Sequence, residues 1–134
     1  MITLTIATRQ HSELCDITAQ VRSSVRTLGL QNGAVLVYSP HTTCGITINE
    51  HADPDVARDV LHILEKTFPW NGAYHHSEGN SAAHMKTIAT GTSVMMIVEN
   101  GEIQLGTWQG IFLCEFDGPR TRNVWIQPLG ERKG

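Results

Sequence analysis

The sequence predicts an α+β domain in which about three helices pack against one face or end of a mainly antiparallel sheet of about seven strands. Hydrophobic residues recur at every second position in several short segments, which is typical of strands, and these segments dominate the C-terminal half. Helical spacing occurs in fewer segments, and these do not alternate regularly with the strands. A length of 134 residues fits one domain, so we expect 1–134 to fold as a unit.

Three helices are expected, and each has a recognisable beginning or end. The expected segments are 17–28, 54–67 and 81–91. Gly29 is a typical C-terminal stop for the first helix. Asp53 followed by Pro54 is a typical start for the second, because the carboxylate caps free backbone N–H groups and proline fits the first helical position.

The strand predictions rest on alternation or on short apolar runs between turn residues. The expected strands are 2–8, 34–39, 45–49, 93–98, 102–105, 111–116 and 124–128. Asn100-Gly101 between two of them predicts a type I′ hairpin turn.

Composition excludes several classes of function. The net charge of −3 gives no basic field for nucleic acid, so we expect no binding of DNA or RNA. No apolar run reaches the length of a membrane span, so we expect no membrane partner. Cys15, Cys44 and Cys114 are widely spaced and odd in number, which indicates reduced thiols and a cytoplasmic location.

A loop rich in histidine, glycine and serine between the second and third helices is the strongest functional signal. His76, Glu78 and His84 lie within it or just after it, with His75 beside them. Neutral imidazoles favour zinc-like metals and also transfer protons near neutral pH. We therefore predict His76 and His84 as metal ligands, and Glu78 as a further ligand or a general base.

A second polar cluster follows the strand that ends near 39. His41, Thr42 and Thr43 form a polar rim suited to a phosphate or hydroxyl group, although the threonines alone would also suit a turn that satisfies its own backbone. Further on, Glu50 and Asp53 are candidate ligands of Mg²⁺, and Asp53 has the competing role of a helix cap. If the fold unites this cluster with the histidine loop, they form a metal or acid–base site with His41 as a third ligand.

Trp108 and Gln109 lie between Gly106 and Gly110. An indole face can stack on a heteroaromatic ring and an amide can read its edge, whereas a β-bulge with a packed tryptophan would need no ligand. Cys44 lies near His41, but a packed thiol explains it better than a nucleophile.

The sequence resembles the YjbQ family of small bacterial and archaeal proteins, also described as secondary thiamine-phosphate synthases. The resemblance covers nearly the whole chain and rests on HTTCGITINEHADPDV (41–56), HHSEGNSAAHMK (75–86) and GTWQGIFLCEFDGPR (106–120). His75 is the one departure, at a position that the family does not fix as histidine.

The resemblance implies a compact α+β homotrimer and a site that includes residues beyond the histidines. The matching positions are His41, Thr42, Glu50, Asp53, His76, Glu78, His84, Lys86, Trp108 and Gln109. It also implies a reaction that joins hydroxymethylpyrimidine diphosphate to a thiazole phosphate and releases pyrophosphate, as a secondary activity.

The resulting hypothesis is a metal-binding enzyme acting on a phosphorylated small molecule. The catalytic candidates are His41, Glu50, Asp53 and Glu78; the substrate-binding candidates are Thr42, Thr43, Lys86, Trp108 and Gln109; the metal candidates are His41, His76 and His84. The metal would be zinc-like at the histidines, or Mg²⁺ arriving with a diphosphate. Two alternatives are a metal-dependent hydrolase of a small metabolite and a non-catalytic protein that binds one.

Overall fold

The structure, a computed structural model, describes residues 1–132 and contains eight strands and three helices in that range. The strands are β1 (Ile2–Ala7), β2 (Glu13–Asp16), β3 (Leu30–Tyr38), β4 (Cys44–Glu50), β5 (Ser93–Glu99), β6 (Glu102–Ile103), β7 (Gln109–Glu115) and β8 (Thr121–Arg132). The helices are α1 (Thr18–Leu28), α2 (Pro54–Thr67) and α3 (Ser81–Thr90). The predicted α+β class is confirmed.

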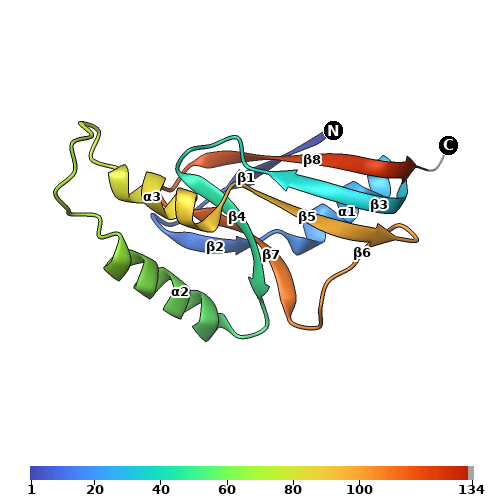
Figure 1. Ribbon diagram of the computed structural model, residues 1–134, viewed down its shortest axis with the longest axis horizontal. Helices are drawn as coiled ribbons and strands as arrows, with labels where there is room; N and C mark the ends of the chain where they lie inside the picture. Colours follow the sequence, from blue (N-terminus) through green and yellow to red (C-terminus); the bar gives the residue numbers. More distant parts are fainter. Residues whose placement is uncertain (133–134) are drawn as a thin grey trace.

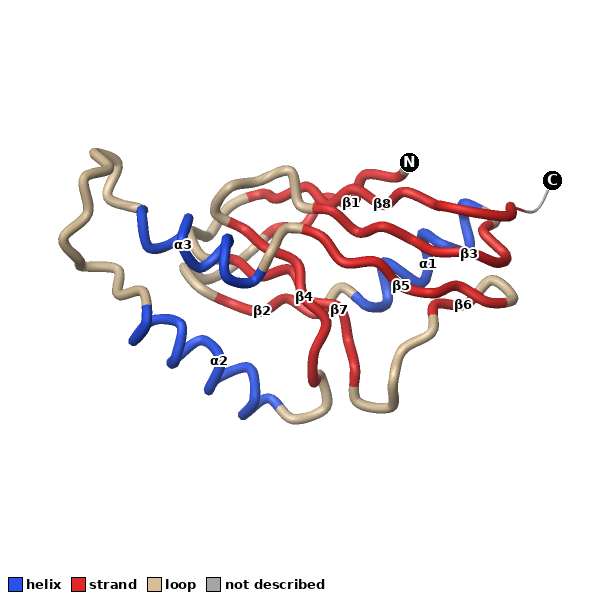
Figure 2. The backbone as a smooth tube through the Cα atoms, viewed as in Figure 1, coloured by secondary structure: helices blue, strands red, loops and turns tan. Residues whose placement is uncertain are grey.

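The strands form two antiparallel sheets that share one hydrophobic core. The larger sheet has the order β1-β8-β3-β5-β6, and the smaller has the order β2-β7-β4. Val35 and Ile126 of the larger sheet, Ile46 and Leu113 of the smaller sheet, and Val25 of α1 are all fully buried in this core. Figures 1 and 2 show α1 close to the larger sheet, and α2 and α3 at the opposite end of the molecule.

The other face of the smaller sheet carries a second, smaller hydrophobic cluster. Ala83 of α3 packs there with Phe112, Cys114 and Phe116. Leu61 and Leu64 of α2 and the neighbouring Trp70 are only partly buried against it. None of the residues of α2 is fully buried, so this helix contacts the cluster through partly buried side chains.

Most of the locally encoded elements agree with their predictions. Gly29 ends α1 in the left-handed conformation, with φ of 69°. Asp53 caps α2 by accepting a hydrogen bond from the backbone of Asp55. Asn100 and Gly101 both have positive φ, and Glu99 pairs with Glu102 across them, as a type I′ turn requires.

The differences concern strands whose formation depends on distant partners. The four residues of β2 form a strand that their own short pattern does not predict, because pairing with Leu113 and Cys114 of β7 fixes them. The return strand after the hairpin covers only Glu102–Ile103, and β8 extends to Arg132. Within residues 1–132, no helix is long and apolar enough to cross a membrane.

β4 determines where the predicted site residues lie. It spans Cys44 to Glu50 in an extended conformation, so its two ends are about 20 Å apart at a rise of about 3.3 Å per residue. Thr43 precedes one end, and Glu50 is the last residue of the other. Polar clusters at these two ends therefore cannot meet within one chain.

Candidate functional site

One pocket unites the histidine loop with the polar residues that follow β3. It has a volume of about 440 Å³. Its lining residues are Pro40, His41, Thr42, Thr43, His76, Glu78, Asn80, His84, Asp117, Arg120 and Arg122. We call this the histidine–arginine pocket. Two segments separated by more than thirty residues in the sequence, 40–43 and 76–84, thus meet as predicted, and the segment after β7 adds a third wall.

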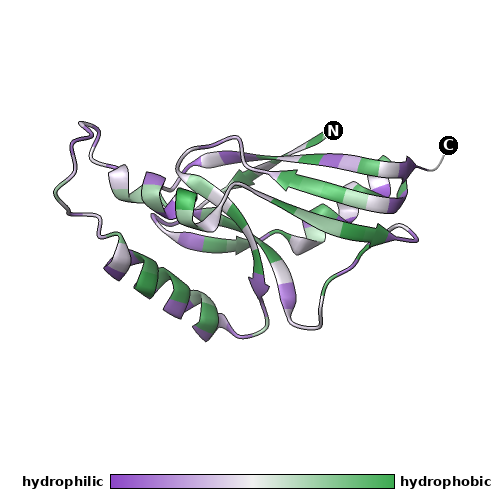
Figure 3. Cartoon of the chain, viewed as in Figure 1, coloured by the Kyte–Doolittle hydropathy of each residue, from purple (hydrophilic) through white to green (hydrophobic). Residues whose placement is uncertain are grey.

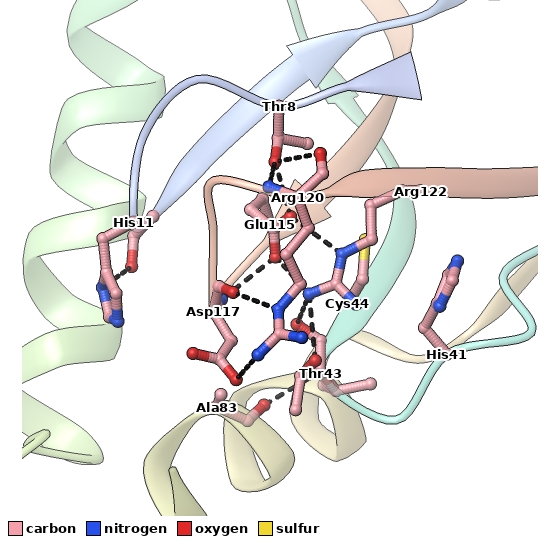
Figure 4. Close-up of polar contacts among 12 residues, drawn as sticks. Thr8, His11, His41, Thr43, Cys44, Ala83, Glu115, Asp117, Arg120 and Arg122 are labelled. Carbon is pink, nitrogen blue, oxygen red and sulfur yellow. Dashed lines mark hydrogen bonds and ion pairs between the residues drawn. The ribbon is translucent and has the colours of Figure 1, made fainter. Parts of the chain in front are cut away.

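A buried ion pair forms the floor of the histidine–arginine pocket. Arg122 is 4% exposed, and its guanidinium donates hydrogen bonds to both carboxylate oxygens of Glu115, which is fully buried. The same guanidinium donates to the hydroxyl of Thr43 at 2.9 Å, and Thr8 donates to Glu115 at 2.7 Å. Figure 4 shows this network joining β1, β4, β7 and β8 at one point.

The network decides the charge of the buried carboxylate. Burial by itself would raise the pKa of Glu115, but hydrogen bonds from Arg122, from the backbone of Asp117 and from Thr8 lower it below its usual value. Burial opposes the charge of Arg122 as well, yet its bonds to Glu115 raise the pKa of the guanidinium. Both groups are therefore charged at neutral pH, and each neutralises the other.

A second arginine lies at the rim. Arg120 donates to the side chain of Asp117 at 2.9 Å and to its backbone oxygen at 2.6 Å. Asp117 also accepts a hydrogen bond at 2.9 Å from the side-chain amide of Asn80, the residue before α3. The remaining amide oxygen of Asn80 is buried without a partner in the described chain. These contacts hold the half-exposed guanidinium of Arg120 beside the pocket.

His41 is oriented by the neighbouring strand. Its Nε2 accepts a hydrogen bond at 2.9 Å from the backbone N–H of Asn123 in β8. Partial burial, together with the nearby charge of Arg122, lowers the pKa of His41. The neutral ring therefore carries its proton on Nδ1 and can donate that N–H to an acceptor in the pocket while the bond to Asn123 persists.

His76 and His84 form the closest pair of imidazoles. Their ring centroids are 5.5 Å apart, with the rings nearly perpendicular. His84 lies in the first turn of α3, as predicted, and Nε2 of His76 is 3.9 Å from the carboxylate of Glu78. Within residues 1–132 of the single chain, no group of three or more His, Cys, Asp or Glu side chains is arranged to hold a metal.

Four predicted site residues lie at the far end of β4. Glu50 pairs with Gln109 across the edge of the smaller sheet, and Trp108 beside it is 64% exposed. The side chain of Asp53 caps α2, so its helix-capping role is confirmed. This edge also holds a hydrogen bond that the sequence did not predict, between Nδ1 of His51 and the carboxylate of Asp16 at 2.9 Å.

Lys86 faces away from the histidine–arginine pocket. It lies two residues after His84, and two residues turn an α-helix by about 200°, so their side chains leave opposite sides of α3. Lys86 lines a separate cavity and pairs with Glu65 of α2 at 2.7 Å. Within one chain, its ammonium therefore cannot share a ligand with the histidines.

The residues that sequence reasoning missed are those of the polar floor and rim. They are Thr8, Asn80, Glu115, Asp117, Arg120 and Arg122. One signal was available, because Arg120 and Arg122 alternate in and just before a strand and therefore share one side of it. The long-range partners in this network carried no such signal, since Thr43 lies 79 residues from Arg122 and Thr8 lies 107 residues from Glu115.

Comparison with known proteins gives consistent matches. Residues 2–131 match the family model described as UPF0047 protein YjbQ-like. The UPF0047 protein YugU of Bacillus subtilis is 52% identical over 129 residues, which cover 96% of this chain and 98% of that protein. A UPF0047 protein of Methanocaldococcus jannaschii is 44% identical over 127 residues, covering 95% of this chain and 92% of that protein.

Solved structures agree with these matches. An uncharacterised YjbQ/UPF0047 protein of Clostridium acetobutylicum superposes with a TM-score of 0.94 at 49% identity, covering 96% of this chain and all of that one. A conserved hypothetical protein of Thermus thermophilus superposes with a TM-score of 0.90 at 41% identity, covering 96% of this chain and all of that one.

Proposed function

Since the chain belongs to the UPF0047 YjbQ-like family, we propose that its histidine–arginine pocket binds the phosphate groups of a small metabolite and catalyses a reaction at them. The observation that carries the proposal is the pairing of a buried, fixed guanidinium with three histidines in one cavity of about 440 Å³. Arginine matches the geometry of phosphate oxygens, and imidazole can donate or accept the proton that a phosphate reaction moves.

The floor of the pocket supports phosphate binding because it presents an N–H donor in a fixed orientation, whereas the charge of Arg122 is balanced by Glu115. Nε and one Nη of Arg122 are held by Glu115 and Thr43, and the other Nη has no hydrogen bond within residues 1–132. Fixing a donor before the ligand arrives lowers the entropic cost of binding. Arg120 at the rim and the hydroxyl of Thr42 are further donors of the same pocket.

The reaction we propose is the one that the family resemblance implies, thiamine-phosphate synthesis as a secondary activity. When pyrophosphate leaves the pyrimidine methylene, negative charge grows on the departing oxygen, and Arg120 and Arg122 would stabilise it. A histidine of the pocket would protonate or orient the departing group. Glu78 is the carboxylate that we propose as general base, because it lines the pocket, whereas Asp117 of the same pocket is already paired with Arg120.

A metal is part of the proposal. His76 and His84 would supply two nitrogen ligands to a zinc-like ion. His41 lines the same pocket and would supply a third through Nε2 once that atom gives up its hydrogen bond to the backbone of Asn123 and the side chain rearranges. A bound divalent metal would supply Lewis-acid assistance to the phosphate oxygens. Because zinc is usually held by three or four protein ligands, we propose that a second copy of the chain or the substrate completes the coordination.

Self-association could also bring the predicted residues at the far end of β4 close to the histidine–arginine pocket of another copy. The outer face of the larger sheet exposes Tyr38 stacked on Trp125, together with Met95, Ile97 and Leu129. Figure 3 shows the hydrophobic character of β3 and β5, the strands that carry three of them. Exposed apolar patches of this kind mark protein interfaces. The patch adjoins the pocket, because Asn123, two residues from Trp125, contacts His41.

We therefore propose that copies associate through this face as the homotrimer that the resemblance implies, with Glu50, Trp108 and Gln109 of one copy approaching the pocket of another. Light scattering after size exclusion would test it. The wild type should have three times the 14.8 kDa chain mass, and Ile97→Lys should lower that mass. A monomeric wild type would refute the shared site while leaving the phosphate-binding proposal intact.

Calorimetric titration with pyrophosphate tests the pocket directly. Arg120→Gln removes one rim charge without disturbing the buried pair, and we expect it to weaken binding about tenfold, which corresponds to one charge-assisted hydrogen bond. Arg58→Gln is the matched control, because Arg58 forms a comparable exposed pair with Asp55 on α2. Equal affinities of the two variants, or no binding by wild type, would contradict the proposal.

Measurements of turnover distinguish the proposed synthase from the two alternatives, a metal-dependent hydrolase and a non-catalytic binding protein. The wild type, given hydroxymethylpyrimidine diphosphate, thiazole phosphate and Mg²⁺, should release pyrophosphate, and His84→Gln should release less. Hydrolysis of phosphate esters without coupling would favour the metal-dependent hydrolase. Tight binding without turnover, unchanged in Glu78→Gln, would favour the non-catalytic protein.

The metal is tested by elemental mass spectrometry on protein purified without an affinity tag. We expect near-stoichiometric zinc or a similar metal in the wild type and its loss in His76→Ala and His84→Ala. His62→Ala is the control, because His62 lies on α2 outside the pocket. Metal-free wild type would reject the zinc-like site and leave Mg²⁺ carried by the diphosphate as the cofactor.

A further inference from the structure

The side of α3 opposite His84 borders a second cavity, of about 370 Å³, between α2 and the smaller sheet. We call it the Lys86 cleft. Leu61, Leu64 and Phe116 form its apolar wall, and Gln10, His11 and Ser12 form its polar rim. It shares no lining residue with the histidine–arginine pocket. Figure 4 places His11 beside α2, on the far side of the Glu115 network from His41.

The lysine in this cleft is unusual because its side chain is almost fully buried. Lys86 is 2% exposed, and its Nζ donates one hydrogen bond, to Glu65 at 2.7 Å. An ammonium group has three N–H donors, and the other two have no hydrogen bond within residues 1–132. A buried donor without a partner costs free energy, so the cleft favours a molecule that supplies an acceptor.

Glu65 determines the charge that this acceptor should have. The hydrogen bond from Lys86 is the main cause that lowers the pKa of Glu65, so the carboxylate is ionised. Its second oxygen accepts the backbone N–H of Trp70 at 2.9 Å. The ammonium is thus already paired with a carboxylate, each of whose oxygens accepts one hydrogen bond. A further anion would be repelled by Glu65, whereas an uncharged oxygen acceptor would not.

We propose that the Lys86 cleft is a second binding site, for a small uncharged molecule with a carbonyl or hydroxyl oxygen at one end and an apolar body. The oxygen accepts hydrogen bonds from Lys86, and the apolar body packs on Leu61, Leu64 and Phe116. Since α2 contributes one wall and buries no residue fully, the ligand also strengthens the contact between α2 and the smaller sheet. This site is independent of the phosphate chemistry proposed above.

The test is a titration of isotope-labelled protein with δ-valerolactam, followed by amide chemical shifts in NMR spectra. We expect saturable shifts confined to residues 10–12, 61–65, 86 and 116, with a dissociation constant of about a millimolar, which suits a ligand of seven heavy atoms. Lys86→Met keeps the length and apolar stem but removes the donors, and should weaken binding about tenfold or more. Lys66→Met, on the exposed side of α2, is the matched control and should bind as wild type does.

Several outcomes would overturn the proposal. These are absence of saturable shifts, equal binding by Lys86→Met and wild type, or tighter binding of butyrate than of the lactam. If Lys86→Met does not fold, Leu61→Trp serves instead, because the larger side chain fills the cleft while leaving Lys86 and Glu65 in place. Lactam binding that survives this substitution would also refute the site. Pyrophosphate binding at the other pocket should be the same in every one of these variants.

Discussion

Arg122 and Glu115 form an ion pair from which water is excluded, with exposed fractions of 4% and 0% for their side chains. Their elements are joined by a short turn, but the pair also ties in Thr43 before β4 and Thr8 after β1. One charge pair therefore joins three chain segments, and two of them, at Thr43 and at Arg122, line the histidine–arginine pocket. The pocket and the stability of the fold depend on the same two side chains.

We predict that Arg122→Met lowers the free energy of unfolding by about 3–5 kcal/mol, because it leaves the Glu115 carboxylate buried without its charge partner. Chemical denaturation measures this loss. Arg26→Met is the control, since Arg26 forms an exposed pair with Glu102 and its removal should cost less than about 1 kcal/mol.

The double substitution Glu115→Leu with Arg122→Met separates the cost of an unpaired charge from the value of the pair. It should recover much of the lost stability, because a well-packed apolar pair can replace a buried ion pair. A single Arg122→Met variant as stable as Arg26→Met would show that the pair does not hold these segments together.

Stability should also fall as the pH is lowered from neutral. The pKa of His41 is lowered in the folded protein, so the unfolded chain takes up a proton first as the pH falls below about 6.5. The pKa of Glu115 is also lowered, so its contribution is present above about pH 4.3 and is lost as the pH falls through its folded pKa. Glu13, Asp16 and Glu65, whose pKa values are lowered too, act in the same direction.

Urea denaturation between about pH 2 and pH 8 would measure these two steps. His41→Gln should flatten the part of the profile above about pH 5, because glutamine cannot take up the proton. The acidic part should be unchanged, since the carboxylates still titrate. A His41→Gln profile identical to that of wild type would mean that His41 titrates equally in the folded and unfolded chain.

Local elements could be predicted from the sequence better than the tertiary contacts between them. Asp53-Pro54 and Asn100-Gly101 determine a helix start and a turn through their own backbone preferences, so pattern alone predicted them. The floor of the pocket forms where β4, β7 and β8 come together. No local sequence pattern indicates which residues of these strands lie next to one another. For this reason Arg122 was missed.

The same limit explains the predicted site residues that lie apart. His41 and Glu50 are nine positions apart in the sequence, yet an intervening extended strand separates them by far more than a helix of that length would. A motif that is continuous in sequence was thus divided between two ends of one strand. Lys86 and His84 were predicted to belong to one site, but they lie two residues apart in α3, so their side chains leave opposite sides of the helix.

The three cysteines should be inert in the folded protein. Burial raises the pKa of Cys44 to about 12 and that of Cys114 further still, so neither forms the thiolate that reacts. Cys15 is only partly buried, but burial and the hydrogen bond to Glu13 raise its pKa as well. Iodoacetamide at pH 8 should label none of them in the native state and all of them in urea. Rapid native labelling of Cys44 would revive it as a nucleophile beside His41.

Asp53 has two proposed roles that two substitutions can separate. Asparagine caps helices about as well as aspartate, so Asp53→Asn should change the free energy of unfolding by only a few tenths of a kcal/mol, whereas Asp53→Ala should lower it by about 1 kcal/mol. Neither effect depends on catalysis. Release of pyrophosphate from the diphosphate substrate supplies the second measurement. If the carboxylate acts in the reaction, Asp53→Asn should lose about a hundredfold in rate despite its intact fold. Full activity in Asp53→Asn, with reduced stability in Asp53→Ala, would assign Asp53 to the helix alone.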